Sequence, residues 1–408
     1  MRYLVPAAAA WLFLSAAAPA ADEPARKCQP ATTPAASGEE IDRLILQLGD
    51  DDMTKRKSAM ARLEAIGEPV VARLKRAAES ADDPEVRKAA KLLLEKFDAK
   101  ARGLLYVFGG SIPRADALAI SADGKRAVSA AADGALRYYD LDEHALIRQI
   151  VAHQGQATCV ALSPDGRRVL SGGNDRMMKL WDLESGAEIR SFAGHGNVVL
   201  ELAFSADGKT AVSACSDGNG RHWDLASGKL LQLAETGADR IALTVALTPD
   251  GKKVVTGGQP WSHMWLWDLS TGKQGRHFEG HDQGVRRVAI SPDGERLLSA
   301  GFDGMVRLWD LGAGKEIKTF EGHNSLTSVS FTPDGKRAVC SYSPGPAGAA
   351  DGQEGPSSLK LWDLASGKEI KQFSGLRYPV QCFAISGDGR RLISGCTDGT
   401  IQVWEMPK

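Results

Sequence analysis

The pattern of hydrophobic positions changes its period near residue 103. Before this point, apolar side chains follow helical spacing, as at Ile41, Leu44, Ile45 and Leu48. Beyond it, short segments alternate apolar and polar residues between turn signals, which is typical of β-strands. The pattern therefore predicts a small α-helical domain at residues 39–100 and a mainly β domain at residues 103–408.

Four short amphipathic helices are expected in the first domain. Asp51 is predicted to cap the second helix, which ends at Gly67, and Pro69 lies near the start of the third. Asp83 followed by Pro84 predicts the start of the fourth. One or two antiparallel helical hairpins of this kind resemble a HEAT-like repeat pair.

The β domain repeats a unit that ends in an aromatic–acidic pair. The acidic residues of successive pairs are 42, 42, 44, 42, 53 and 42 residues apart. An Asp-Gly turn precedes each pair, and Gly supplies the positive φ that tight hairpin turns need. A period near 42 residues with four strand-like segments predicts propeller blades. The seven pairs predict seven blades and are Tyr139-Asp140, Trp181-Asp182, Trp223-Asp224, Trp267-Asp268, Trp309-Asp310, Trp362-Asp363 and Trp404-Glu405.

With a Gly-His dipeptide before three of the units, at Gly194, Gly280 and Gly322, residues 103–408 resemble the WD-repeat family. The resemblance implies a seven-bladed β-propeller that binds proteins or peptides without catalysis. The seventh unit lacks a strand after its aromatic–acidic pair. We expect residues 104–108 to supply that strand, so that the two ends of the domain close the ring.

Sets of His, Ser, Asp and Trp recur in three units, with offsets of 18, 22 and 28 residues from the His. They could be taken for serine-hydrolase triads. However, an active site is not needed three times, and no Gly-x-Ser-x-Gly turn surrounds the serines. The resemblance instead implies buried structural networks, so no catalytic residue is predicted. The sets are His153, Ser171, Asp175 and Trp181; His195, Ser213, Asp217 and Trp223; and His281, Ser299, Asp303 and Trp309.

The fourth, sixth and seventh units depart from this pattern and indicate where a partner binds. The sixth carries an insertion at residues 343–357, which lies between its second and third strands. Aromatic residues and Arg are frequent at binding hot spots. We therefore predict a partner surface on the rim over blades four to seven. The alternative is that these side chains only cover the rim; they are Trp261, His263, Phe302, Arg377 and Tyr378.

Composition narrows the classes of partner. The net charge is −1, which argues against a nucleic-acid partner.

The sequence motifs do not indicate a cofactor or a metal. No phosphate loop or His-Glu-x-x-His motif occurs in the sequence, and no cofactor or metal is predicted. His263 is interpreted as a rim histidine. The alternative function is a periplasmic propeller enzyme of the lactonase or quinone-dependent dehydrogenase type, with its site at the central channel.

The N-terminal residues predict export. Arg2, the apolar stretch 4–14 and the small residues near Ala20 resemble a signal peptide at residues 1–20. An uncleaved membrane anchor is the alternative. Residues 21–38 are rich in Ala, Pro and Thr and are expected to form a disordered linker. A periplasmic, secreted or envelope-associated location follows, and five of the six cysteines are expected to be buried thiols on separate strands.

Overall fold

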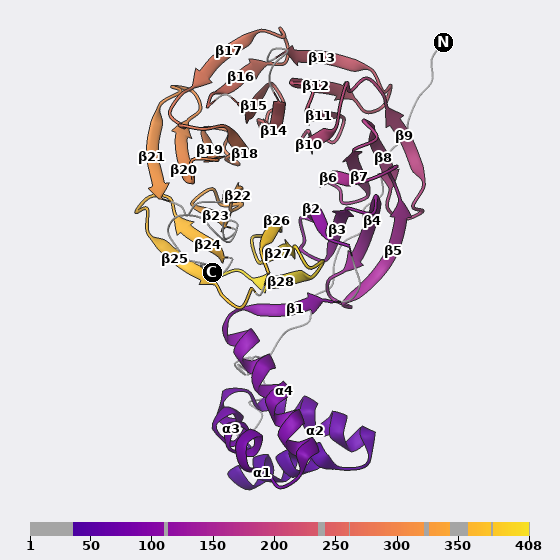
Figure 1. Cartoon of the computed structure of the whole chain (residues 1–408), viewed down its shortest axis with the longest axis vertical. Helices are drawn as coiled ribbons and strands as arrows, with labels where there is room; N and C mark the ends of the chain where they lie inside the picture. Colours follow the sequence, from indigo (N-terminus) through magenta and orange to yellow (C-terminus); the bar gives the residue numbers. More distant parts are fainter. Residues whose placement is uncertain are drawn as a thin grey trace, which may run out of the picture. The chain divides into compact units, whose positions relative to one another are not determined.

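The computed structural model describes residues 36–109, 113–235, 241–260, 262–321, 326–342, 358–376 and 378–407. The chain divides into two compact units between Leu93 and Leu94. The first is helical and the second contains all of the described strands, which are arranged around a ring (Figure 1). The insertion at 343–357, together with Trp261, Arg377 and His323, lies outside the described residues.

The helical unit has four α-helices among its described residues. Leu63, Val70, Leu74 and Leu93 are completely buried and form its core. The elements are α1 (Gly38–Leu46), the 3₁₀ helix η1 (Gln47–Gly49), α2 (Met53–Ile66), the 3₁₀ helix η2 (Glu68–Val70), α3 (Val71–Ser80) and α4 (Pro84–Ala101).

The helix ends follow the capping residues with one correction. Asp52, and not the predicted Asp51, caps α2, and its side chain accepts a hydrogen bond from the Thr54 N–H at 2.8 Å. Asp52 has the extended backbone that an N-cap needs, since its ψ is 112°. Gly67 ends α2 with φ at 81°, as its position predicted. A HEAT-like pairing of these helices stays a prediction.

Seven four-stranded antiparallel sheets form the seven blades of a β-propeller, which confirms the predicted fold class. Blades 1 to 3 are β2 (Ala115–Ile120), β3 (Arg126–Ala131), β4 (Ala135–Asp140) and β5 (Ala145–Val151); β6 (Ala157–Leu162), β7 (Arg168–Gly173), β8 (Met178–Asp182) and β9 (Glu188–Phe192); and β10 (Val199–Phe204), β11 (Thr210–Cys215), β12 (Asn219–Asp224) and β13 (Leu230–Glu235).

The remaining blades follow in chain order around the ring. Blades 4 to 6 are β14 (Ile241–Leu247), β15 (Lys253–Gln259), β16 (Met264–Asp268) and β17 (Gln274–Phe278); β18 (Val285–Ile290), β19 (Arg296–Gly301), β20 (Met305–Asp310) and β21 (Glu316–Glu321); and β22 (Leu326–Phe331), β23 (Arg337–Tyr342), β24 (Ser358–Asp363) and β25 (Glu369–Phe373). Blade 7 is β26 (Val380–Ile385), β27 (Arg391–Cys396), β28 (Ile401–Glu405) and β1 (Leu104–Phe108).

The strand β1 closes the ring, as its sequence position led us to expect. It pairs antiparallel with β28, with Val107 opposite Gln402 and Phe108 opposite Ile401 (Figure 1). The Phe108 ring lies 4.8 Å from the ring of Tyr139 in blade 1. The N-terminal strand of the propeller therefore both completes blade 7 and contacts blade 1.

The Asp-Gly turns join the first and second strands of every blade. Their seven glycines have φ between 66° and 74°, the left-handed region that glycine adopts without strain. In blade 1, Asp123 Oδ1 accepts hydrogen bonds from Ser121 Oγ at 2.6 Å and from the Lys125 N–H at 3.0 Å. These bonds lower the pKa of Asp123. The recurring sequence signal is therefore a recurring hydrogen-bonded turn.

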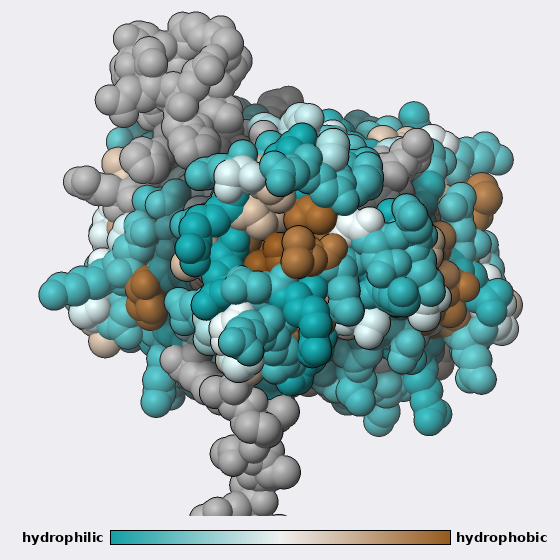
Figure 2. All heavy atoms as spheres, turned by 90° about the horizontal axis from the view of Figure 1, so that it is seen from below, coloured by the Kyte–Doolittle hydropathy of each residue, from teal (hydrophilic) through white to brown (hydrophobic). Residues whose placement is uncertain are grey.

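The hydrophobic core lies between blades. Successive residues of a second strand point to the two opposite faces of the blade. In blade 1, Ala127 packs toward blade 7 and Val128 toward blade 2. Each of the seven propeller clusters combines residues of two adjacent blades. Figure 2 shows one side of the molecule, where hydrophilic residues cover most of the described surface and hydrophobic ones form small groups.

Candidate functional site

Two rims of the propeller are defined by its connections. Because each sheet is antiparallel, the links that enter each first strand lie at the same end as the turns between second and third strands. We call this end the upper rim. The Asp-Gly turns and the turns between third and fourth strands form the lower rim.

Three predicted partner-binding residues can be placed, and all three lie on the upper rim. His263 precedes β16, Phe302 follows β19 and Tyr378 precedes β26. Tyr378 is 48% exposed, which leaves much of its ring open to a partner. Phe302 is partly exposed, and the guanidinium of Arg286 lies 5.7 Å from its ring centre. The partner-binding role of these residues stays a prediction.

His263 has neighbours that its sequence position did not indicate. Its Nε2 lies 3.8 Å from Glu279 Oε1, and the Nε2 of His277 lies 2.8 Å from the same oxygen. The two imidazoles are stacked with centroids 6.3 Å apart. Within the described ranges, no group of three or more His, Cys, Asp or Glu side chains is arranged to hold a metal ion. The close pair of His277 and Glu279 therefore lies directly beside His263.

The innermost strands carry a second polar group that sequence reasoning missed. Glu201 of β10 reaches past blade 4 to Arg287 of β18, with Oε1 and Nη1 2.7 Å apart. Its other oxygen accepts the N–H of Val245 in β14 at 2.9 Å. One carboxylate thus links the first strands of blades 3, 4 and 5. Arg286 lies next to this ion pair in sequence.

The His–Ser–Asp–Trp sets form hydrogen-bonded chains inside blades 2 and 5. In blade 2, Trp181 Nε1 donates to Ser171 Oγ at 2.9 Å, and that oxygen lies 2.7 Å from His153 Nε2. The other ring nitrogen, Nδ1, lies 2.9 Å from Asp175. Burial lowers the pKa of His153, which favours the neutral imidazole that such a chain requires.

Blade 5 repeats this geometry and adds a cation. His281 joins Ser299 at 2.7 Å and Asp303 at 2.9 Å, and Trp309 donates to Ser299 at 2.8 Å. Arg307 approaches Asp303 at 2.8 Å. Burial alone would raise the pKa of Asp303, but its hydrogen bonds with His281 and Arg307 outweigh burial and lower the pKa strongly. The carboxylate therefore stays ionised inside the blade.

Blade 3 departs from the predicted chain at its last link. Trp223 and His195 both reach Ser213, at 3.0 and 2.8 Å. However, Asp217 turns to Arg221 at 2.6 Å and to a backbone N–H, so the buried Nδ1 of His195 has no partner in the described structure. Burial first, and the charge of Arg221 second, lower the pKa of His195 to about 4.

The other blades keep parts of the network. Trp267 donates to Thr256 in blade 4 and Trp404 to Ser394 in blade 7, both at 2.9 Å. In blade 1 the hydroxyl of Tyr139 lies 3.4 Å from Ser129, a long contact. In blades 4 and 7 the indole N–H is therefore matched by a buried hydroxyl although the His is replaced, whereas in blade 6 the buried indole N–H of Trp362 does not reach Ser341, which bonds Thr327.

A hydrolase interpretation of these serines does not fit their surroundings. Ser171, Ser213 and Ser299 are completely buried, and each hydroxyl is held between an indole N–H and an imidazole. A nucleophile must be reachable by a substrate carbonyl. These hydroxyls stabilise the blades instead.

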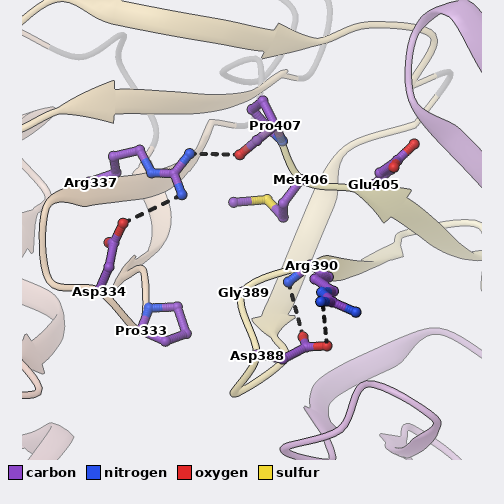
Figure 3. A pocket seen from close by; sticks show the side chains of 9 residues that line it. All are labelled: Pro333, Asp334, Arg337, Asp388, Gly389, Arg390, Glu405, Met406 and Pro407. Atoms are coloured by element: carbon purple, nitrogen blue, oxygen red, sulfur yellow. Dashed lines mark hydrogen bonds and ion pairs between the residues drawn. The ribbon is translucent and has the colours of Figure 1, made fainter. Parts of the chain in front are cut away.

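The lower rim holds a cavity of about 570 Å³ between blades 6 and 7 (Figure 3). In blades 2, 5 and 7 an arginine at the start of the second strand donates to the turn of the next blade, as Arg168 does to the Gly208 carbonyl at 3.1 Å. Arg337 of blade 6 donates instead to the Pro407 carbonyl at 2.7 Å and pairs with Asp334 at 3.5 Å (Figure 3). The cavity therefore lies where the C-terminal segment is tied to blade 6.

The cysteines in the described part of the chain are buried and free. Five thiols lie on separate strands, as predicted, at Cys159, Cys215, Cys340, Cys382 and Cys396. Burial raises the pKa of Cys159 to about 12, so it is a poor nucleophile at neutral pH. Among the described residues, no helix combines the length and apolar character needed to cross a bilayer.

Comparison with known proteins identifies the repeats. The family described as WD domain, G-beta repeat matches residues 145–182, 186–224, 272–310, 314–353 and 367–405. The first match runs from the fourth strand of blade 1 to the third strand of blade 2. The third strands of blades 1, 4 and 6, which end in Asp140, Asp268 and Asp363, lie outside the matched segments.

Curated relatives match parts of the chain. Over 148 residues it is 32% identical to the small ribosomal subunit protein RACK1y of Oryza sativa subsp. japonica, covering 35% of this chain and 40% of the relative. Over 174 residues it is 31% identical to RACK1 of Caenorhabditis elegans (40% and 50%). Over 194 residues it is 27% identical to the serine-threonine kinase receptor-associated protein of Mus musculus (40% and 55%). The chain thus spans about half the length of these relatives.

Proposed function

Because this chain is a WD-repeat β-propeller, we propose that it is a non-catalytic scaffold that binds a protein or peptide partner on its upper rim, over blades 4 to 7. The observation that carries this proposal is where the repeated polar side chains lie and what they bond. The hydroxyls and imidazoles that could serve catalysis are buried inside blades and hydrogen-bonded there, whereas aromatic side chains reach the upper rim.

The relatives support a binding role. Two are named as proteins of the small ribosomal subunit and one as a protein associated with a serine-threonine kinase receptor. These names describe proteins that work by joining a larger assembly. We carry only the mode of action to this chain, because each alignment covers part of the relative, and fold alone does not define a partner.

The test is capture of partners by the tagged full chain, compared with a double variant, Phe302→Ala with Tyr378→Ala. Removing two rim aromatics is expected to reduce captured partner at least tenfold, since truncated hot-spot side chains cost about 2 kcal/mol or more. The matched control is Leu146→Ala with Ile147→Ala, which removes exposed apolar side chains of 50% and 44% exposure from the outermost strand β5. Equal capture by both double variants and the parent would contradict the rim assignment.

We also propose that the scaffold acts in the cell envelope. Its support is the N-terminal sequence, in which Arg2 and the apolar stretch 4–14 resemble an export signal. A fusion of the full chain to a reporter that is active only outside the cytoplasm is expected to be active. Deletion of residues 1–20 should abolish that activity. An inactive full-length fusion would overturn the location, and full activity of the deletion variant would overturn the role of residues 1–20 in export.

A further inference from the structure

The innermost strand of blade 5 carries two adjacent arginines near the upper rim. Arg286 and Arg287 follow Val285, the first residue of β18, at a β-bulge. A bulge leaves two residues opposite one on the partner strand, which turns neighbouring side chains in different directions. Arg287 extends toward Glu201, whereas Arg286 lies beside Phe302.

The two guanidinium groups differ in charge compensation. Glu201 pairs with Arg287 at 2.7 Å. Among the residues that the structure describes, no carboxylate lies within ion-pair distance of Arg286, whose recorded contact is with the Phe302 ring at 5.7 Å. Arg286 is partly buried, and burial together with the charge of Arg287 lowers its pKa.

This position is unusual among the first strands. The residue at the bulge of the first strand is positively charged in blade 5 alone; in blades 1, 2, 3, 4, 6 and 7 it is Asp116, Thr158, Leu200, Leu243, Thr327 and Gln381. Thr158 and Thr327 use this position to bond the next blade, at the carbonyls of Val199 and Val380. Arg286 makes no such bond in the described structure, so its role in holding the ring together is small.

A partly buried cation without a counter-charge is costly unless an anion joins it. From this geometry we propose that Arg286 is an anion-binding residue of the upper rim, which takes a carboxylate side chain of an acidic peptide segment while Phe302 packs against the same segment. Guanidinium binds carboxylate through two parallel hydrogen bonds, and an aromatic face beside it limits its orientations. The inference rests on the proposed binding function and specifies the chemistry of the partner.

A carboxylate fits the local charges better than a cation. Glu201 is already neutralised by Arg287 and by the N–H of Val245, so the group keeps one uncompensated positive charge, at Arg286. A lysine-rich segment would bring like charge toward it. A negative group beside Arg286 would also offset the charge of Arg287.

The experiment measures binding of a short fluorescent peptide, in which glutamate alternates with glycine, to the full chain by anisotropy. The matched probe has glutamine in place of glutamate. Arg286→Gln is expected to weaken binding of the acidic peptide about tenfold, in line with a charge-assisted hydrogen-bonded pair. Arg390→Gln, which removes an 86%-exposed arginine from the lower rim, is the control and should leave binding unchanged.

Each outcome decides the inference. Support requires that the acidic peptide bind more tightly than the glutamine peptide, that Arg286→Lys retain part of the affinity, and that raised salt weaken binding. Equal binding to parent and Arg286→Gln, or no acidic-peptide binding at all, overturns it. If partner capture still depends on Phe302 and Tyr378 in that case, the proposed scaffold function stands and only the acidic specificity fails. Unchanged tryptophan fluorescence of Arg286→Gln shows that the variant is folded.

Discussion

A single buried serine in each regular blade satisfies two other side chains. Ser171 accepts the indole N–H of Trp181 and lies at hydrogen-bond distance from His153. Leaving a buried donor or acceptor without a partner costs more than an average hydrogen bond contributes. The equal offsets marked these residues as a repeated set, and the resemblance to the WD-repeat family implied that they form a buried network.

Replacement of that serine should destabilise a regular blade more than an irregular one. Ser171→Ala leaves both Trp181 and His153 short of a partner, and we expect a loss of about 2–4 kcal/mol in the free energy of unfolding. Ser129→Ala removes only the 3.4 Å contact with Tyr139, and about 1 kcal/mol or less is expected. Denaturant unfolding of both variants measures the difference. Equal losses in the free energy of unfolding would show that the hydrogen bonds to Trp181 and His153 do not contribute to stability.

His195 should make the stability of the propeller depend on pH. Its pKa in the folded protein, about 4, is below the unfolded value of 6.5, so the unfolded chain binds the proton first as pH falls. Its contribution is complete above pH 6.5 and is lost as pH falls toward 4. Over that window the loss is about 3 kcal/mol.

The measurement is thermal unfolding of the parent and of His195→Gln between neutral and mildly acidic pH. The variant lacks the titrating ring, so its melting temperature should fall less steeply with decreasing pH than that of the parent. Parallel pH profiles of the two proteins would contradict the assignment to His195, since the other buried histidines are present in both.

At the level of elements, the strand β1 connects the start of the propeller to its end. It supplies the fourth strand of blade 7 and places Phe108 against Tyr139 of blade 1. Its place followed from the sequence, because a seventh repeat short of one strand and a strand-like segment before the first repeat complement each other. The tie between Arg337 and the Pro407 carbonyl did not, because Arg337 stands at the recurring arginine position but bonds the C-terminal segment in place of the next turn.

Truncation of Phe108, the residue of β1 that packs against blade 1, should weaken the closure of the ring. Phe108 is 7% exposed, and Phe108→Ala is expected to cost about 3–5 kcal/mol, the range for large core aromatics. Leu105 lies on the same strand but is 44% exposed, so Leu105→Ala should change stability by about 0.5 kcal/mol or less. Chemical unfolding compares the two. A small effect of Phe108→Ala would mean that β1 does not hold the ring closed.

At the scale of the whole molecule, the described residues of the propeller form seven hydrophobic cores. Each cluster lies between two adjacent blades, as the one that contains Val128 and Trp181 lies between blades 1 and 2. A blade that unfolds therefore exposes the inner faces of two neighbours. Loss of one blade also opens the ring, so partial unfolding is costly.

The described blades should therefore unfold in one transition. The helical stretch 36–93 contains no tryptophan, whereas Trp181, Trp223, Trp267, Trp309, Trp362 and Trp404 report on six blades. Tryptophan fluorescence is expected to show a single sigmoidal change in denaturant that coincides with the loss of β-sheet signal in circular dichroism. Two separated fluorescence transitions would show that groups of blades unfold independently.

The sequence by itself determined the repeat, the number of blades and the closing strand, and the family resemblance implied the buried indole–hydroxyl pairs. Strand alternation, Asp-Gly turns and the indole–hydroxyl pair each depend on neighbours within one blade, so they appear at fixed spacing. The tertiary structure decided which residues meet across blades and loops. It turned Asp217 to Arg221, brought His277 and Glu279 to His263, and paired Arg287 with Glu201 while leaving Arg286 beside Phe302. Such contacts depend on side-chain packing between blades, for which no local period exists.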